Sequence, residues 1–230
     1  MSPRAPLTVG GVASLTSDLL RRIVYSSFRR AWEEDHQSRA SSPTTVYVTE
    51  VCQCLLRSWY NRTLKSPPSD NKVVLMVIGD SAHYLMKDYF PLGAGEHHAE
   101  RDIGGGVRLV GRADRVLEDA VVEFKTVSRA PDKPYDMHVS QVQLYMWLFD
   151  KSRAFIAYVS RLNGEVKIFE VGRDDAAISR LLERARSFAR CLVSGVVPEA
   201  EENPLCAYCE YRELCSRGAA PAPGEGAKQG

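Results

Sequence analysis

Three cysteines, Cys206, Cys209 and Cys215, fall within ten residues near the end of this sequence. Disulfides between such close neighbours are strained, whereas a shared metal centre accommodates this spacing well. Two further cysteines, Cys52 and Cys54, lie far upstream, among six in all. A chain of 230 residues with no secretory signal is not typical of short, disulfide-rich secreted domains. The cysteine pattern therefore predicts a cytoplasmic metal or cluster site.

Charge and hydropathy exclude several classes of protein. The sequence has 30 Lys and Arg against 29 Asp and Glu, so it lacks the strong basic excess of many nucleic-acid-binding chains, although a local basic channel is compatible with this average. No apolar run reaches the roughly 18 residues that cross a bilayer. The start, Met1-Ser2-Pro3-Arg4, leads into no apolar stretch typical of a secretory signal. We expect a cytoplasmic protein without membrane contact, with one sizeable core or one domain plus a small appendage.

Hydrophobic periodicity predicts an α/β architecture. Apolar residues at helical spacing indicate helices over 14–34, 46–60, 74–90, 135–150 and 174–192. Short β-prone runs indicate strands over 97–103, 107–117, 120–126, 153–160 and 165–171. The segment 120–126 is mostly apolar, as expected of a strand that is covered on both faces. This order of elements predicts a mixed sheet with a crossover helix and helical additions.

Two carboxylates and a lysine are the first candidates for a reactive site. Asp114 ends the run Gly111-Arg-Ala-Asp114 in one predicted strand, and Glu123 and Lys125 lie in the next strand. Because side chains alternate along a strand, Glu123 and Lys125 share a face, and a hairpin would bring Asp114 near Glu123. Charges amid apolar neighbours are costly to bury unless paired or bound to an ion, and carboxylate oxygens suit Mg²⁺ or Mn²⁺. The alternative is an exposed edge strand with ordinary surface charges.

Three more polar residues accompany this group. His83 offers an imidazole in the run Gly79-Asp-Ser-Ala-His83, which is expected to open a helix. Gln141 and Tyr145 are four residues apart on the helix that follows the Glu-x-Lys strand, so they share a helix face. Each residue alone is more typical of a structural role. The order His, Gly-x-x-Asp, Glu-x-Lys and Gln-x-x-x-Tyr is much harder to obtain by chance.

This order resembles the RecB-type nucleases of the PD-(D/E)XK superfamily. The matching runs are Gly111-Arg-Ala-Asp114, Val122-Glu-Phe-Lys125 and Gln141-Val-Gln-Leu-Tyr145. The cysteines narrow the resemblance to the CRISPR-associated exonuclease family, the fourth Cas protein, over roughly residues 46–216. The resemblance implies a RecB-like core, a mixed central sheet flanked by helices, with an N-terminal helical segment and a cysteine-rich C-terminal end that binds a cluster.

The resemblance implies an iron–sulfur cluster held by Cys54, Cys206, Cys209 and Cys215. Cys54 is preferred to Cys52 because the residues after it, Leu-Leu-Arg-Ser-Trp-Tyr, match the family's Cys-Leu-x-Arg-Ser-x-Tyr pattern. A 4Fe–4S cluster is the family's usual form, a 2Fe–2S cluster uses the same thiolates, and tetrahedral Zn²⁺ is a further alternative. The cluster is expected to be structural. Cys52 would then be a buried or spare thiol, and Cys191 is expected to pack in the core.

The resemblance also implies metal-dependent hydrolysis of DNA phosphodiester bonds. The groups expected to hold one or two Mn²⁺ or Mg²⁺ ions are the side chains of His83, Asp114 and Glu123 and the carbonyl of Phe124. Lys125 is expected to orient the attacking water and to stabilise the transition state. Gln141 and Tyr145 are expected to orient Lys125 or the phosphate.

Single-stranded DNA is the expected substrate, because cysteines that clamp the two ends of the chain together suit a groove or ring around one strand. Trp59, Tyr60 and Tyr84 are aromatic residues available for base stacking. The resemblance implies 5′ to 3′ exonuclease action and trimming of new spacer DNA in antiviral defence, alongside the CRISPR integrase and its small companion subunit. The alternatives are a RecB-like nuclease of recombination or repair and a non-catalytic nucleic-acid-binding module with a zinc site.

The expected domain boundaries follow from the same resemblance. An N-terminal helical segment over 1–72 contributes one cluster cysteine, the nuclease core spans 73–195, and the cluster segment spans 196–216. The tail over 217–230 is rich in Gly, Ala and Pro and is expected to be disordered.

Overall fold

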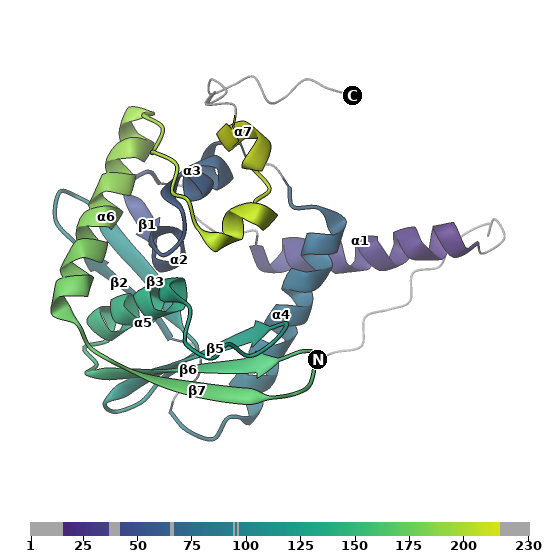
Figure 1. Cartoon of the computed structure of the whole chain (residues 1–230), viewed down its shortest axis with the longest axis horizontal. Helices are drawn as coiled ribbons and strands as arrows, with labels where there is room; N and C mark the ends of the chain where they lie inside the picture. Colours follow the sequence, from purple (N-terminus) through teal and green to yellow (C-terminus); the bar gives the residue numbers. More distant parts are fainter. Residues whose placement is uncertain (1–15, 37–41, 65–66, 94, 96, 217–230) are drawn as a thin grey trace.

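The computed structural model describes residues 16–36, 42–64, 67–93, 95 and 97–216, which form an α/β fold (Figure 1). The helices are α1 (Ser17–His36), α2 (Val48–Val51), α3 (Leu55–Thr63), α4 (Asp70–Tyr89), α5 (Asp136–Leu148), α6 (Asp175–Ser194) and α7 (Arg212–Ser216), with a 3-10 turn, η1 (Pro204–Tyr208). The strands are β1 (Thr45–Tyr47), β2 (His97–Asp102), β3 (Arg108–Ala113), β4 (Arg115–Val116), β5 (Ala120–Val127), β6 (Arg153–Ser160) and β7 (Val166–Gly172). The predicted α/β class is confirmed, and the predicted disordered tail over 217–230 lies outside the described residues.

The strands form two sheets, with the orders β1-β3-β2 and β4-β5-β6-β7. Both sheets mix parallel and antiparallel pairs, because β1 runs parallel to β3 and β5 runs parallel to β6. The first five residues of β5 are buried, which confirms the prediction of a strand covered on both faces. Strand β5 therefore lies inside the molecule and carries Glu123 with it.

Helix α5 is the predicted crossover between β5 and β6 and lies at the centre of the main core. Val142, Leu144 and Met146 are fully buried in one cluster with residues of β3, β5, β6 and α6. Helix α6 covers α5, beginning where the Asp174 carboxylate accepts the Ala177 N–H and ending before Gly195, whose φ of +74° suits glycine. Helix α5 is thus held between the sheets and α6, which fixes the side chains that it directs toward β5.

The prediction of one continuous strand over 107–117 is wrong. The chain leaves the first sheet at Ala113 and enters the second at Arg115, which pairs with Val122 of β5. Asp114 lies at this break, where its carboxylate accepts the backbone N–H of Phe124 at 2.8 Å. A side-chain hydrogen bond, accepted by Oδ2, thus holds the predicted Asp114 against β5 at this break.

The prediction of one helix over 46–60 is also wrong. The residues Thr45–Tyr47 form β1, which pairs in parallel with β3, and two helices follow it. Three β-prone residues favour this short strand. The helices α2 and α3 are separated at 52–54, because Cys54 has a non-helical backbone (φ −53°, ψ 123°) as the residue that precedes α3. Both upstream cysteines therefore lie in or beside a loop.

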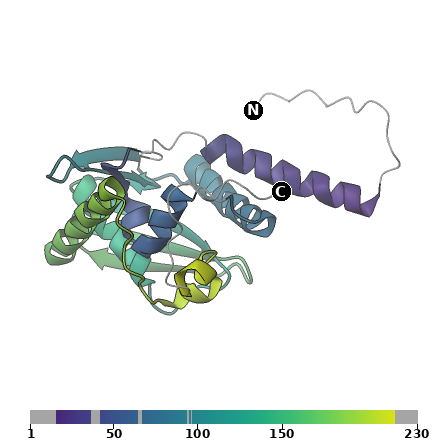
Figure 2. The ribbon, with the colours of Figure 1, turned by 90° about the horizontal axis from the view of Figure 1, so that it is seen from above.

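Helices α1 and α4 pack on each other beside the sheets, and Figure 2 shows α1 projecting away from them. Helix α4 begins after Ser69, whose hydroxyl accepts the Lys72 N–H, so the predicted start at 74 is four residues late. His83 therefore lies well inside α4, and the prediction that the run from Gly79 opens a helix is wrong. A Cβ at Gly79 would stand 3.4 Å from Oγ1 of Thr126, so α4 packs close to β5 at this glycine.

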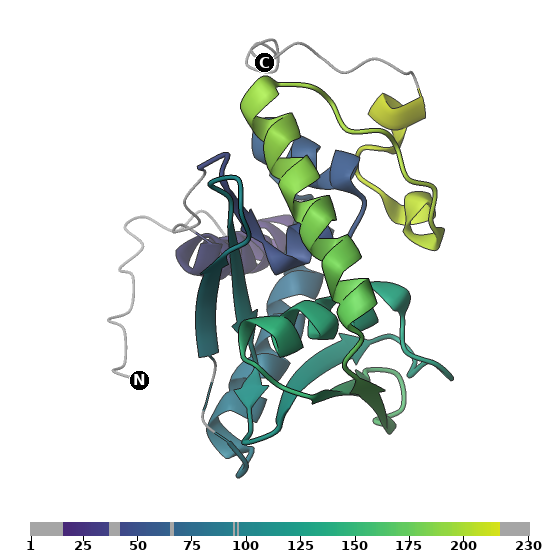
Figure 3. The same ribbon diagram turned by 90° about the vertical axis from the view of Figure 1, so that its left-hand side faces the viewer.

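The C-terminal segment lies against α3 (Figure 3), so residues from both ends of the chain meet. The rings of Tyr60 and Tyr211 have centroids 5.0 Å apart, and the Tyr211 hydroxyl donates to Asn61 at 2.9 Å. None of the helices in the described part of the chain has the length and apolar character needed to cross a membrane.

Candidate active site

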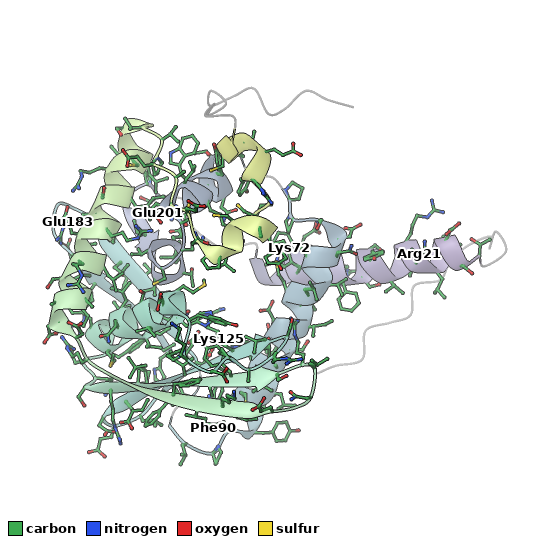
Figure 4. All side chains as sticks on the ribbon, in the orientation of Figure 1. Arg21, Lys72, Phe90, Lys125, Glu183 and Glu201 are labelled. Atoms are coloured by element: carbon green, nitrogen blue, oxygen red, sulfur yellow. The ribbon has the colours of Figure 1, made fainter. Side chains whose placement is uncertain are left out.

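Glu123 and Lys125 leave the same face of β5, as their spacing predicts. The Lys125 ammonium lies 2.6 Å from Oε1 of Glu123, and Glu123 is only 3% exposed. Figure 4 shows Lys125 in the space bounded by α5, α4 and the C-terminal segment. A buried carboxylate next to an ammonium gives a polar site inside an apolar layer.

Gln141 and Tyr145 reach this carboxylate from α5. The Gln141 side chain donates to Oε1 of Glu123 at 2.8 Å and lies 2.9 Å from the Tyr145 hydroxyl. The four-residue spacing puts both side chains on the helix face that covers β5. Oε1 of Glu123 is therefore fixed from two directions, by Gln141 and by Lys125.

Asp114 completes the group from the break between β3 and β4, and His83 reaches it from α4. Nδ1 of His83 lies 3.0 Å from Oδ1 of Asp114, and Oδ2 accepts the Phe124 N–H. Because Asp114 is ionised, the His83 nitrogen is the donor in this pair. The structure thus brings together all the predicted catalytic residues, from α4, the β3–β4 break, β5 and α5.

The two carboxyl groups have pKa values shifted in opposite directions. Burial raises the pKa of Glu123 to about 7, although the Lys125 ammonium acts against this shift. Burial also pushes the pKa of Asp114 upward, but the hydrogen bond and charge of His83, with the Phe124 amide, hold that pKa below its usual value. The bond to Asp114 raises the pKa of His83. Asp114 is therefore anionic near neutral pH. The negative charge of an ionised Glu123 is only partly compensated by the Lys125 ammonium.

One oxygen of Glu123 indicates what this site can bind. Oε2 is buried and has no hydrogen-bond partner among the described residues, which is costly for a carboxylate. Together with the Asp114 carboxylate it supplies the hard donors that suit Mg²⁺ or Mn²⁺. No three His, Cys, Asp or Glu side chains of the described residues form a complete metal cage. The residues therefore fit a divalent ion that keeps several waters and takes one or two carboxylates.

The packing around Gly111 explains why the Gly-x-x-Asp run begins with glycine. A Cβ at this position would lie 2.5 Å from Leu148, 3.0 Å from Tyr145 and 3.1 Å from Val48. The absence of a side chain on β3 therefore lets α5 approach closely, which brings Tyr145 and Gln141 to their positions over β5.

A pocket of about 330 Å³ adjoins the site on the α4 side. Its lining consists of Ser81, Ala82, His83, Leu85, Met86, Phe124, Lys125, Thr126 and Val159. His83 and Lys125 belong to both the pocket and the polar group, so the site has room beside it for part of a substrate.

Cys54 and the three C-terminal cysteines lie in two neighbouring segments from distant parts of the sequence, although no three thiols of the described residues are grouped closely enough to hold a metal ion. Cys206 lies in η1, Cys209 follows it, and Cys215 lies in α7, while Cys54 precedes α3. Partial burial raises the pKa of the Cys215 thiol, and the charges of Cys54, Cys206 and Cys209 raise it further. The three other thiols are thus within electrostatic reach of Cys215. Four thiols from two segments are a donor set that suits iron or zinc.

Cys52 has different surroundings. Burial raises the pKa of its thiol to about 12, and the charges that act on it come from Arg184, Lys125 and Glu123. Cys52 therefore lies toward the polar site on β5, whereas Cys54 lies toward the C-terminal cysteines. Cys52 and Cys191 pack against the hydrophobic core, as do Cys54 and Cys209, so this packing does not separate ligands from ordinary thiols.

Arg184 is a residue that the sequence patterns did not single out. Its guanidinium donates to the carbonyls of Val51 and Gln53, both at 2.8 Å, and to both oxygens of Glu201, at 2.5 and 2.6 Å. Figure 4 labels Glu201 on the segment that leads to η1. One side chain of α6 thus joins the loop before Cys54 to the chain before the C-terminal cysteines. An arginine on a helix face is too common a feature to be recognised from sequence.

Glu210 makes a second connection between the ends. Lys72 lies 2.5 Å and Arg57 3.3 Å from the Glu210 carboxylate, and Figure 4 labels Lys72 on α4. Because α4 also carries His83, the cysteine segment is joined to the helix that supplies the site's imidazole. We call these contacts of Arg184 and Glu210, with the Tyr60–Tyr211 pair, the terminal clamp.

The aromatic residues expected to stack on bases are placed differently from the prediction. Trp59 and Tyr60 are 2% exposed and belong to the core, so their assignment as base platforms is wrong. They pack between α3 and the rest of the core because α3 needs an apolar face. Tyr84 is 51% exposed. The sequence patterns did not single out Tyr135, an exposed aromatic residue just before α5 whose ring packs on Tyr158, the β6 partner of Lys125.

Residues 14–216 match the family described as the PD-(D/E)XK nuclease superfamily. The chain belongs to this superfamily. It is 25% identical over 199 residues to the CRISPR-associated exonuclease Cas4 of Saccharolobus solfataricus, covering 79% of this chain and 92% of that protein. The crystal structure of SSO0001 has the same fold, with a TM-score of 0.65 at 24% identity over 86% of this chain and 98% of that one.

The chain is therefore a nuclease of the PD-(D/E)XK type and a homologue of a Cas4 exonuclease. Its fold is the RecB-like core with helical additions that the sequence motifs predict. The matched residues include the terminal clamp and the three C-terminal cysteines.

Proposed function

We propose that the chain hydrolyses phosphodiester bonds in DNA with Mn²⁺ or Mg²⁺ held by Asp114, Glu123, His83 and the carbonyl of Phe124. The unpartnered, buried Oε2 of Glu123 is the observation that supports this proposal most directly. Nδ1 of His83 is engaged by Asp114, so Nε2 is the nitrogen that remains for a metal. When bound, the ion supplies an activated water and compensates charge on the phosphate.

The residues of the chain have separate tasks in this reaction. Asp114 stays anionic near neutral pH and is oriented by His83 and by the Phe124 amide. Lys125 places an ammonium beside the phosphate, where it orients the attacking water and stabilises the charge that develops on the phosphate oxygens. Gln141 keeps Oε1 of Glu123 in place, which directs the other oxygen toward the metal. Tyr145 holds the Gln141 amide.

We further propose that the four cysteines near the terminal clamp, Cys54, Cys206, Cys209 and Cys215, hold an iron–sulfur cluster of the 4Fe–4S type. The charges that act on Cys215 come from Cys54, Cys206 and Cys209, whereas those that act on Cys52 come from Arg184, Lys125 and Glu123, which supports the set with Cys54. The role of the cluster is structural, since hydrolysis of a phosphodiester transfers no electrons.

The substrate and pathway are proposed from the chain's relative. Likeness to a CRISPR-associated exonuclease over most of both chains supports 5′ to 3′ trimming of single-stranded DNA during spacer acquisition. In that role the CRISPR integrase and its small companion subunit are the proposed partners. Co-purification of the integrase with this chain, and not with a recombination helicase, is the expected result.

Digestion of end-labelled DNA tests the nuclease proposal. With Mn²⁺, the wild type is expected to shorten a single strand faster than a duplex and to release a 5′ label first, whereas EDTA stops the reaction. Glu123→Ala and Asp114→Ala should reduce cleavage to background. Glu118→Ala, a change at an exposed position in the same β4–β5 hairpin, serves as the matched control and should cleave like the wild type. Full cleavage by Glu123→Ala would contradict the site assignment.

A further inference from the structure

Tyr135, His138 and Tyr158 form an aromatic cluster beside Lys125 that the proposed chemistry does not use. Tyr158 is the partner of Lys125 in the parallel β5–β6 pairing, so the two side chains leave one face of the sheet from adjacent strands. Strand β6 lies on the opposite side of β5 from β4, and Asp114 directly precedes β4. The aromatic cluster therefore flanks Lys125 on the side away from Asp114.

The three rings hold one another in place. The Tyr135 ring lies 5.6 Å from the His138 ring at 72° and 5.7 Å from the Tyr158 ring at 88°, measured between centroids and planes. The Tyr158 hydroxyl accepts the Tyr135 N–H at 3.1 Å and shares a hydrogen bond with Nδ1 of His138 at 2.8 Å. Burial and, to a lesser extent, the Lys125 charge lower the pKa of His138 to about 3, so its ring is neutral near pH 7.

Tyr135 differs from the other two rings in its exposure. Tyr158 is fully buried, whereas 46% of Tyr135 is accessible to solvent. The Tyr135 side chain makes no hydrogen bond that caps the N-terminus of α5, so it does not stabilise the start of this helix in that way. The exposed charges next to it in sequence are of both signs, Lys133 together with Asp132 and Asp136. An aromatic ring that is fixed by its neighbours and open to solvent can stack on a base of a single strand.

We infer that Tyr135 is a stacking platform for one nucleobase of the strand whose phosphate lies at Lys125 and Glu123. His138 and Tyr158 are positioning residues that keep the platform in place. This inference rests on the proposed function, because it takes single-stranded nucleic acid as the ligand of the same site. It replaces the buried Trp59 and Tyr60 as the source of base stacking.

Binding of fluorescent oligonucleotides tests the platform, with Ca²⁺ in place of Mn²⁺ and fluorescence anisotropy as the readout. A set of strands carrying one abasic residue at successive positions locates the stacked base, since the wild type should bind one of them about tenfold more weakly. Tyr135→Ala should bind the intact strand about tenfold more weakly than the wild type does, and should lose nothing more when that base is removed. Tyr135→Phe should behave like the wild type.

Tyr89→Ala is the matched control, because Tyr89 is an exposed tyrosine (80%) at the end of α4. Tyr135→Leu, which keeps an apolar side chain without an aromatic ring, serves as the second variant if thermal unfolding shows that Tyr135→Ala is disturbed. Wild-type binding by both variants would overturn the inference, as would equal losses on every abasic strand. A wild type that shows the abasic pattern but does not cleave would refute the proposed reaction and leave the platform standing.

Discussion

Gln141 donates its side-chain N–H to Oε1 of Glu123 at 2.8 Å and leaves Oε2 of the same carboxylate without a partner. Lys125 approaches the oxygen that Gln141 already occupies. One carboxylate oxygen of Glu123 is therefore bound by side chains of the protein, and the other is available to a ligand. The pKa of about 7 for Glu123 reflects the same imbalance, because burial is offset only in part by Lys125.

Glu123→Gln is expected to remove metal binding without unfolding the protein, since the amide matches the carboxylate in size and lacks its charge. Mn²⁺ at about 100 times its Kd should stabilise the wild type by about 2.7 kcal/mol. Thermal unfolding with Mn²⁺ and with EDTA measures this difference, which should vanish in Glu123→Gln. Glu118→Gln, in the same hairpin, should keep the full shift. An unchanged shift in Glu123→Gln would show that the ion binds elsewhere.

Gly111→Ala should destabilise the fold, because its methyl group would lie against Leu148, Tyr145 and Val48. Overpacking of this kind costs about 1–3 kcal/mol. Urea unfolding measures the loss, and cleavage should fall too, since displacement of Tyr145 loosens Gln141 over Glu123. Gly172→Ala is the control, because a Cβ there meets nothing within 4 Å. Equal stability of the two variants would refute the close-packing explanation.

The cysteines are distinguished by four serine variants. Cys54→Ser and Cys209→Ser should lose iron and the visible absorbance of an iron–sulfur cluster, because each removes one proposed ligand. Cys52→Ser and Cys191→Ser should keep both signals, since these thiols are outside the proposed ligand set and their charges do not act on Cys215. Metal analysis of protein purified without oxygen gives the iron content. Iron loss in Cys52→Ser together with retention in Cys54→Ser would reverse the assignment, and stoichiometric zinc in a colourless wild type would replace iron with zinc.

Arg184→Met should weaken the terminal clamp, because it leaves two backbone carbonyls and the Glu201 carboxylate without their donor. The expected loss in the free energy of unfolding is about 2 kcal/mol, measured by urea titration. Arg180→Met, four residues earlier on α6 at an exposed position, is the control and should change little. Equal urea midpoints for the two variants would show that the Arg184 contacts do not contribute to the free energy of unfolding.

His138 predicts a pH dependence of stability. The unfolded chain takes up a proton on this histidine below about pH 6.5, whereas the folded protein does so only near its pKa of about 3. The free energy of unfolding should therefore fall with decreasing pH in this window, by about 2 kcal/mol from His138 between pH 6.5 and 5. Urea unfolding at pH 7 and pH 5 should show a smaller loss for His138→Gln. Parallel losses in both proteins would show that Tyr135, Tyr158 and Lys125 do not keep His138 neutral.

The sequence was sufficient for most of the fold because its strongest patterns are local. The alternation around Glu123 and Lys125 and the spacing of Gln141 and Tyr145 each depend on a single strand or helix, and the structure shows both arrangements. The break at Asp114 was missed because it depends on a hydrogen bond to a different strand, which no local pattern encodes. The short β1 was missed for the same reason, as its pairing partner β3 lies about sixty residues later.

Contacts between distant segments were the least predictable part of the site. Arg184 and Glu210 are ordinary surface-type residues in sequence, and only the folded chain shows what they join. Aromatic residues posed the opposite difficulty, because Trp59 and Tyr60 have a side-chain chemistry that suits both a core and a base platform. Burial alone separates these roles, and burial depends on the whole fold.

The terminal clamp also sets an order of events during synthesis. Arg57 and Glu210 are 153 positions apart, and Gln53 and Arg184 are 131 apart. A ribosome makes the N-terminal half first, so α3 and Cys54 are finished long before their partners exist. A chain that stops before Glu201 has none of the C-terminal partners of the clamp and none of the three C-terminal thiols. The clamp can therefore close only after the residues up to Tyr211 have been made.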